Sequence, residues 1–195
     1  MTDEGIREDP RVTRSRAAVL EAAVRELAEE GYGGFTIDGV ATRSGVARST
    51  IYRLWPERAD LVVAALRAVH PQPTARDDSR EDVRALLGHL DSAFNDSLVA
   101  ECLPAIIEGS ERDPAFRAVH HAANDARRAR LVRAVRRGVD DGDWPDTDAE
   151  LAALALVGAL VYARLMTSRR LAGAELDRLI GVVLGGPATG PASAG

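Results

Sequence analysis

The residues best suited to chemistry lie in the short segment 47–55, and that chemistry is hydrogen bonding to a nucleic acid. The spacing predicts a helix with Ile51 and Trp55 on its apolar side and Arg48 and Arg53 on its polar side. An arginine guanidinium can donate two hydrogen bonds to O6 and N7 of a guanine in the major groove of DNA. We therefore interpret Arg48 as the candidate base-reading residue.

The elements that must position this segment are short helices bounded by glycine and proline. A first helix is expected from Thr13 to Gly31. A second follows the good N-cap Thr36 and ends at Gly45, because glycine turns cheaply into the left-handed region. The third helix stops at Pro56, which lacks the N–H needed to continue it. Two short helices joined by a tight glycine turn are what a helix-turn-helix requires.

The run from Gly31 to Arg58 closely resembles the N-terminal domain of the TetR family of transcriptional regulators. The matching elements, each at the family's spacing, are the glycine and aromatic residue before Thr36, Val40-Ala41, Gly45-Val46, Thr50-Ile51-Tyr52, Trp55 and Arg58. The resemblance covers about residues 13–66, roughly a third of the chain. Two positions depart from the pattern. Ala47 replaces a capping serine, a loss of about 1 kcal/mol, and Glu57 replaces a small capping residue.

This resemblance implies which side chains contact DNA. Arg48 matches a position that commonly contacts bases, and Ser49 and Arg53 flank it. Positions that usually hold phosphates are matched by Thr36, Thr50, Tyr52 and Arg58. Arg43, Arg14 and Arg16 are also expected to neutralise phosphates of the DNA backbone. Two of these assignments have structural alternatives. Tyr52 could pack on the core, and Arg48 and Arg53 could be merely solvated. The residues Phe35, Val40, Val46, Ile51 and Trp55 are expected to form the core.

The rest of the chain predicts more helices. His70-Pro71-Gln72-Pro73 cannot stay helical, and the helical patterns beyond it span about 79–97, 98–109, 113–141, 147–171 and 174–185. No strand pattern occurs, so the fold class is all-α. The resemblance implies an N-terminal three-helix helix-turn-helix DNA-binding domain and a C-terminal helical ligand-binding and dimerisation domain. The predicted division is a flexible arm at 1–12, a DNA-binding domain at 13–70, a second domain at 71–186 and a disordered tail at 187–195.

The second domain is expected to dimerise. One helix-turn-helix, here residues 36–55 and called the reading head below, offers few base contacts, and specific binding normally needs two copies on a palindrome. The family resemblance implies a four-helix interface, which we place on Ala152, Ala155, Leu156, Gly158, Ala159, Leu160, Leu179, Ile180 and Val183. Alternatively, these residues are only the core of the monomer. The resemblance also implies a pocket for an unknown small-molecule inducer, with candidates Phe94, Leu98, Cys102, Ile106, Phe116, His120, Tyr162 and Met166.

Composition and charge exclude several classes. The net charge is −5, but the segment 11–58 carries eight arginines against six carboxylates, so a DNA-binding face is confined to it. Cys102 alone makes no disulfide framework. The acidic N-terminus does not resemble a signal peptide, and the apolar run 151–163 is short for a membrane span, so we expect a cytoplasmic protein. No cofactor, catalytic residue or metal site is indicated.

The hypothesis is therefore a palindrome-binding, ligand-released repressor that binds double-stranded operator DNA as a homodimer. The weaker alternatives are an enzyme and a helical adaptor that binds only protein.

Overall fold

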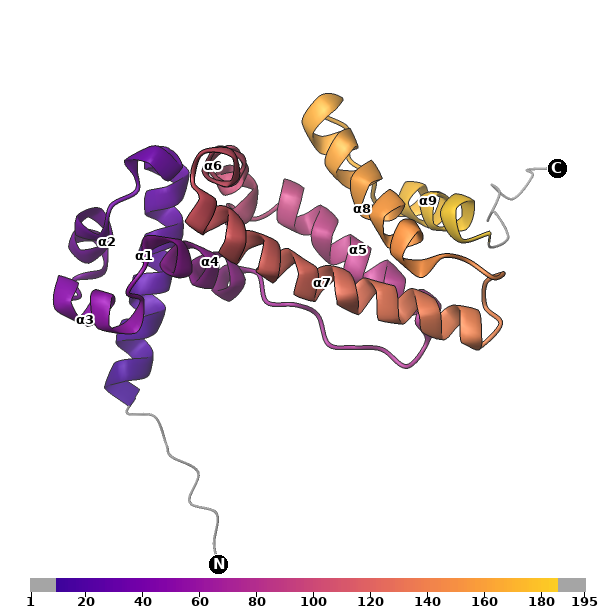
Figure 1. The fold of residues 1–195 in the computed structure, drawn as a ribbon, viewed down its shortest axis with the longest axis horizontal. Coiled ribbons are helices and arrows are strands. Elements are labelled where there is room, and N and C mark those ends of the chain that lie inside the picture. Colours follow the sequence, from indigo (N-terminus) through magenta and orange to yellow (C-terminus); the bar gives the residue numbers. More distant parts are fainter. Residues whose placement is uncertain (1–9, 186–195) are drawn as a thin grey trace, which may run out of the picture. The chain divides into compact units, whose positions relative to one another are not determined.

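The computed structural model describes residues 10–185, and in this range every regular element is a helix (Figure 1). The helices are α1 Pro10–Gly34, α2 Ile37–Ser44, α3 Arg48–Leu54, α4 Arg58–Val69, α5 Ser79–Asn95, α6 Leu98–Arg112, α7 Pro114–Asp140, α8 Ala149–Met166 and α9 Ala174–Leu184. The all-α prediction is confirmed. Residues 1–9 of the expected arm and the whole expected tail, 187–195, lie outside the described residues.

Most helix boundaries lie within two residues of the predicted ones, and the larger differences are in α1, in α6, which ends at Arg112 and not at 109, and in α8, which was predicted to reach 171. Helix α1 begins at Pro10, three residues before the predicted start, which takes residues 10–12 out of the expected arm. Gly31, where the helix was predicted to end, has φ 70° and ψ 176° and kinks the helix, which then continues to Gly34. Helix α8 ends at Met166, where Thr167 and Arg169 donate their N–H groups to the carbonyl of Ala163.

The chain forms two compact units that are not simply consecutive. One comprises the residues up to Pro71 together with Glu101–His120, and the other comprises Gln72–Ala100 together with the residues from His121 onward. The segment Glu101–His120 joins the first unit because it packs on α1. The Cys102 Sγ lies 3.5 Å from the carbonyl oxygen of Val24, and the rings of Phe116 and Tyr32 are 4.5 Å apart. Helices α6 and α7 thus each contribute residues to both units.

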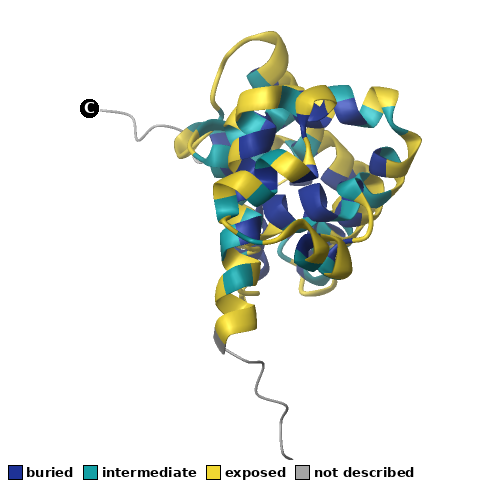
Figure 2. Ribbon diagram, turned by 90° about the vertical axis from the view of Figure 1, so that its left-hand side faces the viewer, coloured by how far each residue is buried: buried dark blue, intermediate teal, exposed yellow. Residues whose placement is uncertain are grey.

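The core of the first unit supports the short helices. Phe35, Val40, Ile51 and Trp55 are buried as predicted, whereas Val46 is only half-buried. Burying large apolar side chains stabilises a fold by about 1.5–3 kcal/mol each. Alternating buried and exposed positions around the helices are visible in Figure 2. The helices α2 and α3 are therefore held by their inner faces, which leaves their outer faces to solvent.

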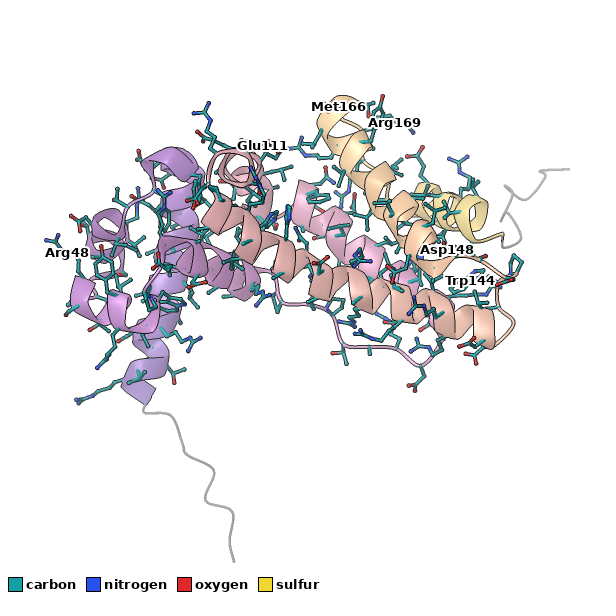
Figure 3. All side chains as sticks on the ribbon, in the orientation of Figure 1. Arg48, Glu111, Trp144, Asp148, Met166 and Arg169 are labelled. Atoms are coloured by element: carbon teal, nitrogen blue, oxygen red, sulfur yellow. The ribbon has the colours of Figure 1, made fainter. Side chains whose placement is uncertain are left out.

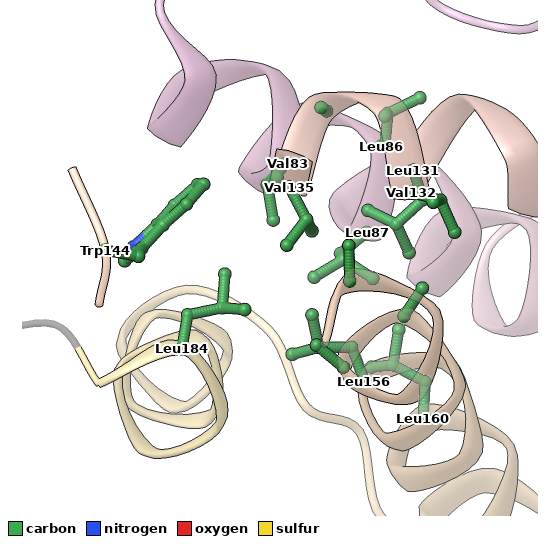
Figure 4. Packing of buried hydrophobic residues seen from close by; sticks show 14 of the residues in the cluster. Val83, Leu86, Leu87, Leu131, Val132, Val135, Trp144, Leu156, Leu160 and Leu184 are labelled. Carbon is green, nitrogen blue, oxygen red and sulfur yellow. The ribbon is translucent and has the colours of Figure 1, made fainter. Parts of the chain in front are cut away.

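The second unit has its own core, formed by α5, α7, α8 and α9 around Leu87, Val135, Leu156 and Leu184 (Figure 4). Trp144, in the turn between α7 and α8, closes one side of it and is 4% exposed. Its ring packs against Gly138, where a Cβ would come within 2.1 Å of the ring. Only glycine fits at that position of α7.

Candidate nucleic-acid interface

The turn between α2 and α3 has the geometry of a helix-turn-helix. The Oγ1 of Thr36 accepts a hydrogen bond from Gly39 N at 3.0 Å and so caps α2. Gly45 adopts φ 67°, and its N–H donates to the carbonyl of Ala41 at 3.0 Å. Ala47 is the N-cap residue of α3, and it provides no side-chain cap because its methyl group cannot accept a hydrogen bond. Both helix ends predicted from Thr36 and Gly45 are present.

Helix α3 has one buried side and one exposed polar side. Ile51 is fully buried and anchors the helix, while Tyr52 is 52% exposed. Arg48, Ser49 and Arg53 are exposed and Thr50 is half-buried. The side chain of Arg48 projects from the edge of its unit in Figure 3. Tyr52 therefore does not pack on the core, and α3 presents hydroxyl, phenol and guanidinium groups together.

Arg48 is paired with a carboxylate of the neighbouring helix. Its Nη1 lies 2.8 Å from Oδ1 and 2.9 Å from Oδ2 of Asp38, the second residue of α2. Both side chains are highly exposed, at 63% and 66%. Arg48 is thus neither buried nor merely solvated, and the pair connects the beginnings of α2 and α3.

The side chain of Arg43 is bonded to two carboxylates of α1. Its Nε donates to Glu26 at 2.7 Å and its Nη2 donates to Glu29 at 2.6 Å. The hydrogen bonds to these two carboxylates raise the pKa of Arg43 above its ordinary value. The Oγ1 of Thr36 also donates to Glu26, at 3.3 Å, so this hydroxyl proton points into the protein. The phosphate contacts expected of Arg43 and Thr36 would compete with these bonds.

Glu26 is the residue that sequence reasoning missed. It is 4% exposed and lies beneath α2, where a Cβ on Gly39 would come within 1.9 Å of its Oε1. A buried carboxylate needs partners, and Arg43 and Thr36 supply them. The signal in the sequence is a glutamate within the apolar stripe of α1, with a glycine at position 39 to leave room.

Arg58 belongs to a second polar cluster, which we call the Asp113 network: Tyr32, Arg58 and Asp113. Asp113 Oδ2 accepts from the hydroxyl of Tyr32 at 2.7 Å and from Arg58 Nη2 at 3.1 Å. The guanidinium of Arg58 also lies 4.3 Å from the ring centre of Tyr32. Sequence reasoning assigned Arg58 to a phosphate. In the structure its side chain instead ties α4 and the end of α1 to the start of α7.

The same contacts shift two pKa values. The hydrogen bond from Tyr32, with backbone N–H donors and Arg58, lowers the pKa of Asp113 to about 2. Burial and the hydrogen bond to Asp113 raise the pKa of Tyr32 to about 12. Asp113 is therefore a carboxylate, and Tyr32 a phenol, at neutral pH.

The residues predicted to line a ligand pocket fall into three groups. Cys102, Ile106, Phe116 and His120 pack in the first unit, where the His120 ring stacks on Phe116 with centres 5.5 Å apart and its Nδ1 lies 3.0 Å from Ser110 Oγ. Burial raises the pKa of the Cys102 thiol to about 12. Phe94 and Leu98 are half-buried in the second unit.

Tyr162 and Met166 form the third group, and they differ from the others because they lie on the surface of their unit. They are 63% and 70% exposed, because they lie on the side of α8 that faces away from the core of its unit. Met166 projects at the end of α8 in Figure 3.

The predicted dimer residues divide between two sides of α8. Ala152, Leu156 and Leu160 are at most 4% exposed and belong to the core of the unit itself. Their assignment to an interface is therefore corrected. Leu179, Ile180 and Val183 of α9 pack partly on that core. On the other side, Ala155 and Gly158 are exposed and Ala159 is half-buried.

That other side carries an exposed apolar surface, which we call the α8 stripe. It comprises Leu151, Leu154, Ala155, Gly158, Tyr162, Leu165 and Met166. At about 100° per residue all seven lie within roughly 60° of Leu151 around the helix. Helix α8 is also long and apolar enough, by length and composition alone, to cross a membrane, a property it shares with core helices of soluble proteins. Sequence periodicity could not separate its faces because both are apolar.

The comparisons with known proteins agree with this geometry. The model of bacterial regulatory proteins of the tetR family matches residues 19–65, and the tetracyclin repressor-like C-terminal domain model matches residues 73–183, more than half of the chain. The chain belongs to the TetR family of transcriptional regulators, which are not enzymes.

Individual relatives and structures add detail. An uncharacterised HTH-type transcriptional regulator of Mycobacterium tuberculosis is 32% identical over 130 residues, which are 64% of this chain and 63% of that protein. The chain thus matches a little less than two thirds of that relative. Another, of Mycobacterium bovis, is 30% identical over 183 residues, covering 88% of this chain and 83% of that protein. The Bacillus subtilis regulator FadR, crystallised with stearoyl-CoA, shares the fold with a TM-score of 0.67, 18% identity and coverage of 87% and 97%.

Proposed function

We propose that this chain is a repressor that binds a palindromic operator in double-stranded DNA as a homodimer and is released by a small-molecule inducer. One observation carries the proposal: helix α3 is anchored by the buried Ile51 and presents Arg48, Ser49, Tyr52 and Arg53 together to solvent. A helix with this division can enter the major groove with donors for bases and phosphates on its outer face.

Four side chains of α3 are exposed, namely Arg48, Ser49, Tyr52 and Arg53, and Thr50 is half-buried. We assign the base contact to Arg48, with Ser49 and Arg53 beside it in the groove, and phosphate contacts to Tyr52 and Thr50. Contacts from Thr36, Arg43 and Arg58 would be secondary, because their side chains already bond to Glu26, Glu29 or Asp113.

Dimerisation is proposed to use the α8 stripe. Large apolar side chains in a contiguous exposed surface usually mark an interface, and Leu151, Leu154 and Tyr162 are each more than 60% exposed. Ala155 and Gly158 lie between them and allow two helices to approach closely. Val182 of α9, 81% exposed, is a further candidate for the same interface.

Release by a ligand is proposed to act through the helices that both units share. Segment Glu101–His120 packs in the first unit, and α7 continues from Pro114 to Asp140 in the second. A ligand that favours a different position of α6 or α7 would therefore disturb the support of the reading head. The inducer is an unidentified small molecule bound within residues 71–186, the predicted second domain. The expected location of the protein is the cytoplasm.

Footprinting on genomic DNA tests the proposal. A protected palindrome is expected, with half-sites about one helical turn, roughly 34–36 Å, apart or slightly more. A helical adaptor that binds only protein would give no protection at any sequence. A thermal-shift screen of small molecules tests the inducer, since a ligand that binds the folded state raises its stability by mass action.

A further inference from the structure

We propose that Asp38 is a positioning residue for base recognition, which holds the Arg48 guanidinium in the orientation that reads a guanine. The inference rests on the proposed function and gives α2 a part in base recognition. Its basis is the pair of short contacts from Arg48 Nη1 to Oδ1 and Oδ2 of Asp38, at 2.8 and 2.9 Å. These contacts join the first residue of α3 to the second residue of α2.

The pair leaves one edge of the guanidinium available. Both contacts use Nη1, and Nε and Nη2 of Arg48 have no hydrogen-bond partner within residues 10–185. These two nitrogens carry parallel N–H donors in the planar fork of an arginine. Parallel donors match O6 and N7 of guanine. Asp38 therefore takes the far end of the fork and leaves a two-donor edge for a base.

Holding the side chain in this way reduces the entropy lost on binding. A free arginine samples many rotamers, and fixing them on binding costs conformational entropy. Arg48 is 63% exposed, so no packing restricts it. The bond to Asp38 supplies a restraint before DNA arrives, and preorganisation of this kind raises affinity for the matching ligand.

The backbone position of Asp38 is well fixed. It lies in the first turn of α2, where the free N–H groups of the helix favour a negative charge. The helix start is fixed by the Thr36 cap and by the close packing of Gly39 on Glu26. Arg48 is in the opposite situation, because a cation at the first position of a helix is disfavoured by the helix dipole. The Asp38 carboxylate offsets that cost.

The alternative role for Asp38 is a simple negative charge that repels phosphate. The two roles give different signatures. A repelling charge weakens binding to every DNA sequence alike, with or without Arg48. A positioning residue changes the preference for one base pair, and only while Arg48 is present.

The test is selection from a randomised duplex library at fixed salt, with the wild type, Asp38→Ala, Asp38→Asn, Arg48→Ala and the double variant Asp38→Ala/Arg48→Ala. Arg48→Ala should lower the guanine preference at one base pair of each half-site by about 5- to 150-fold. Asp38→Ala should lower it at the same base pair by about 2- to 5-fold, the range for an exposed ion pair. Asp38→Asn should fall between wild type and Asp38→Ala, because its amide oxygen still accepts from Nη1. The double variant should equal Arg48→Ala.

Glu21→Gln is the matched control, since Glu21 forms an exposed ion pair with Arg25 within α1. It should leave the preference unchanged. Equal gains in affinity for all sequences on Asp38→Ala would overturn the inference, as would a changed preference at another base pair that persists in the double variant. If the wild type selects no sequence at all, the proposed function itself fails, and this outcome is distinct from a wild type that selects DNA while Asp38→Ala keeps its full preference.

Discussion

The Asp113 network makes a quantitative prediction about the support of the reading head. One oxygen of Asp113 accepts from Tyr32 and Arg58, and the other accepts from the N–H groups of Ala115 and Phe116 at 2.9 and 3.2 Å. The residue thus caps α7 while it ties α7 to α1 and α4. Substituting it should loosen the packing of segment Glu101–His120 on α1 and α4.

The size of the effect follows from the bonds lost. Asp113→Ala removes the cap, which costs about 1 kcal/mol, and leaves the hydroxyl of the buried Tyr32 without its partner, which costs about 1–3 kcal/mol. The ion pair with Arg58 adds less than about 1 kcal/mol, since both side chains are partly exposed. We expect a loss of about 2–4 kcal/mol in the unfolding free energy of the first unit. Asp113→Asn keeps a cap and should lose only about 1 kcal/mol.

The pH dependence has a definite sign. The pKa of Asp113 is lowered to about 2 in the folded protein, against about 4 in an unfolded chain. The charged form is therefore favoured by folding, and its contribution is fully present above about pH 4 and disappears as the pH falls from about 4 through 2. The stability difference between wild type and Asp113→Asn should be constant near neutral pH and should shrink only below about pH 4.

Urea unfolding followed by tryptophan fluorescence measures these differences. Trp55 lies in the first unit and Trp144 in the second, so a Trp144→Phe background makes the signal specific to the first unit. Tyr32→Phe combined with Asp113→Ala completes a double-mutant cycle, which should be strongly non-additive because the two groups share one bond. A loss below about 0.5 kcal/mol for Asp113→Ala, or full additivity in the cycle, would refute the reasoning.

Three further predictions follow from the packing. Gly138→Ala should destabilise the second unit by about 1–3 kcal/mol, because its Cβ would lie 2.1 Å from the Trp144 ring. Gly88→Ala in α5, where a Cβ would have nothing within 4 Å, should stabilise the same unit by about 0.5–1 kcal/mol. The same sign for both changes in urea titrations would contradict the packing described. Ala47→Ser should supply the missing cap of α3 and raise the unfolding free energy by about 0.5–2 kcal/mol, and an unchanged thermal transition would argue against an uncapped helix start. Leu154→Glu should convert a dimer into a monomer in sedimentation experiments, whereas Ile107→Glu, an exposed apolar position of α6 outside the α8 stripe, should leave the dimer intact. A dimeric Leu154→Glu protein would exclude the α8 stripe as the interface.

The reading head was largely predictable because its signals are local. Thr36, Gly45 and Pro56 limit the short helices through their own backbone chemistry, and the apolar spacing identified Ile51 and Trp55 as core. The arginine partners were not predictable in this way. Arg43 meets Glu26 across 17 positions, and Arg58 meets Asp113 across 55. Such pairs depend on tertiary packing, which helical periodicity does not reveal.

The second unit shows a different limit. Helix α8 is apolar on both sides, so periodicity could not tell the core side, with Leu156, from the exposed side, with Leu154. The core was identified only by the packing of α5, α7 and α9 on one side. The segment Glu101–His120 could not be assigned either, because its position in the chain places it after the boundary near Pro71 while its contacts place it in the first unit.

The central claim is that Arg48 of α3 reads a guanine in the major groove, and base-analogue substitution tests it most directly. Replacing guanines of the selected operator one at a time by 7-deazaguanine removes the N7 acceptor while base pairing is kept. Because O6 stays in place, only one of the two hydrogen bonds is lost, and we expect a loss of about 0.5–1.5 kcal/mol in binding free energy at one guanine of each half-site for the wild type. No loss is expected there for Arg48→Ala. A wild type that tolerates every substitution, or an Arg48→Ala variant with the same sensitive guanine, would contradict it.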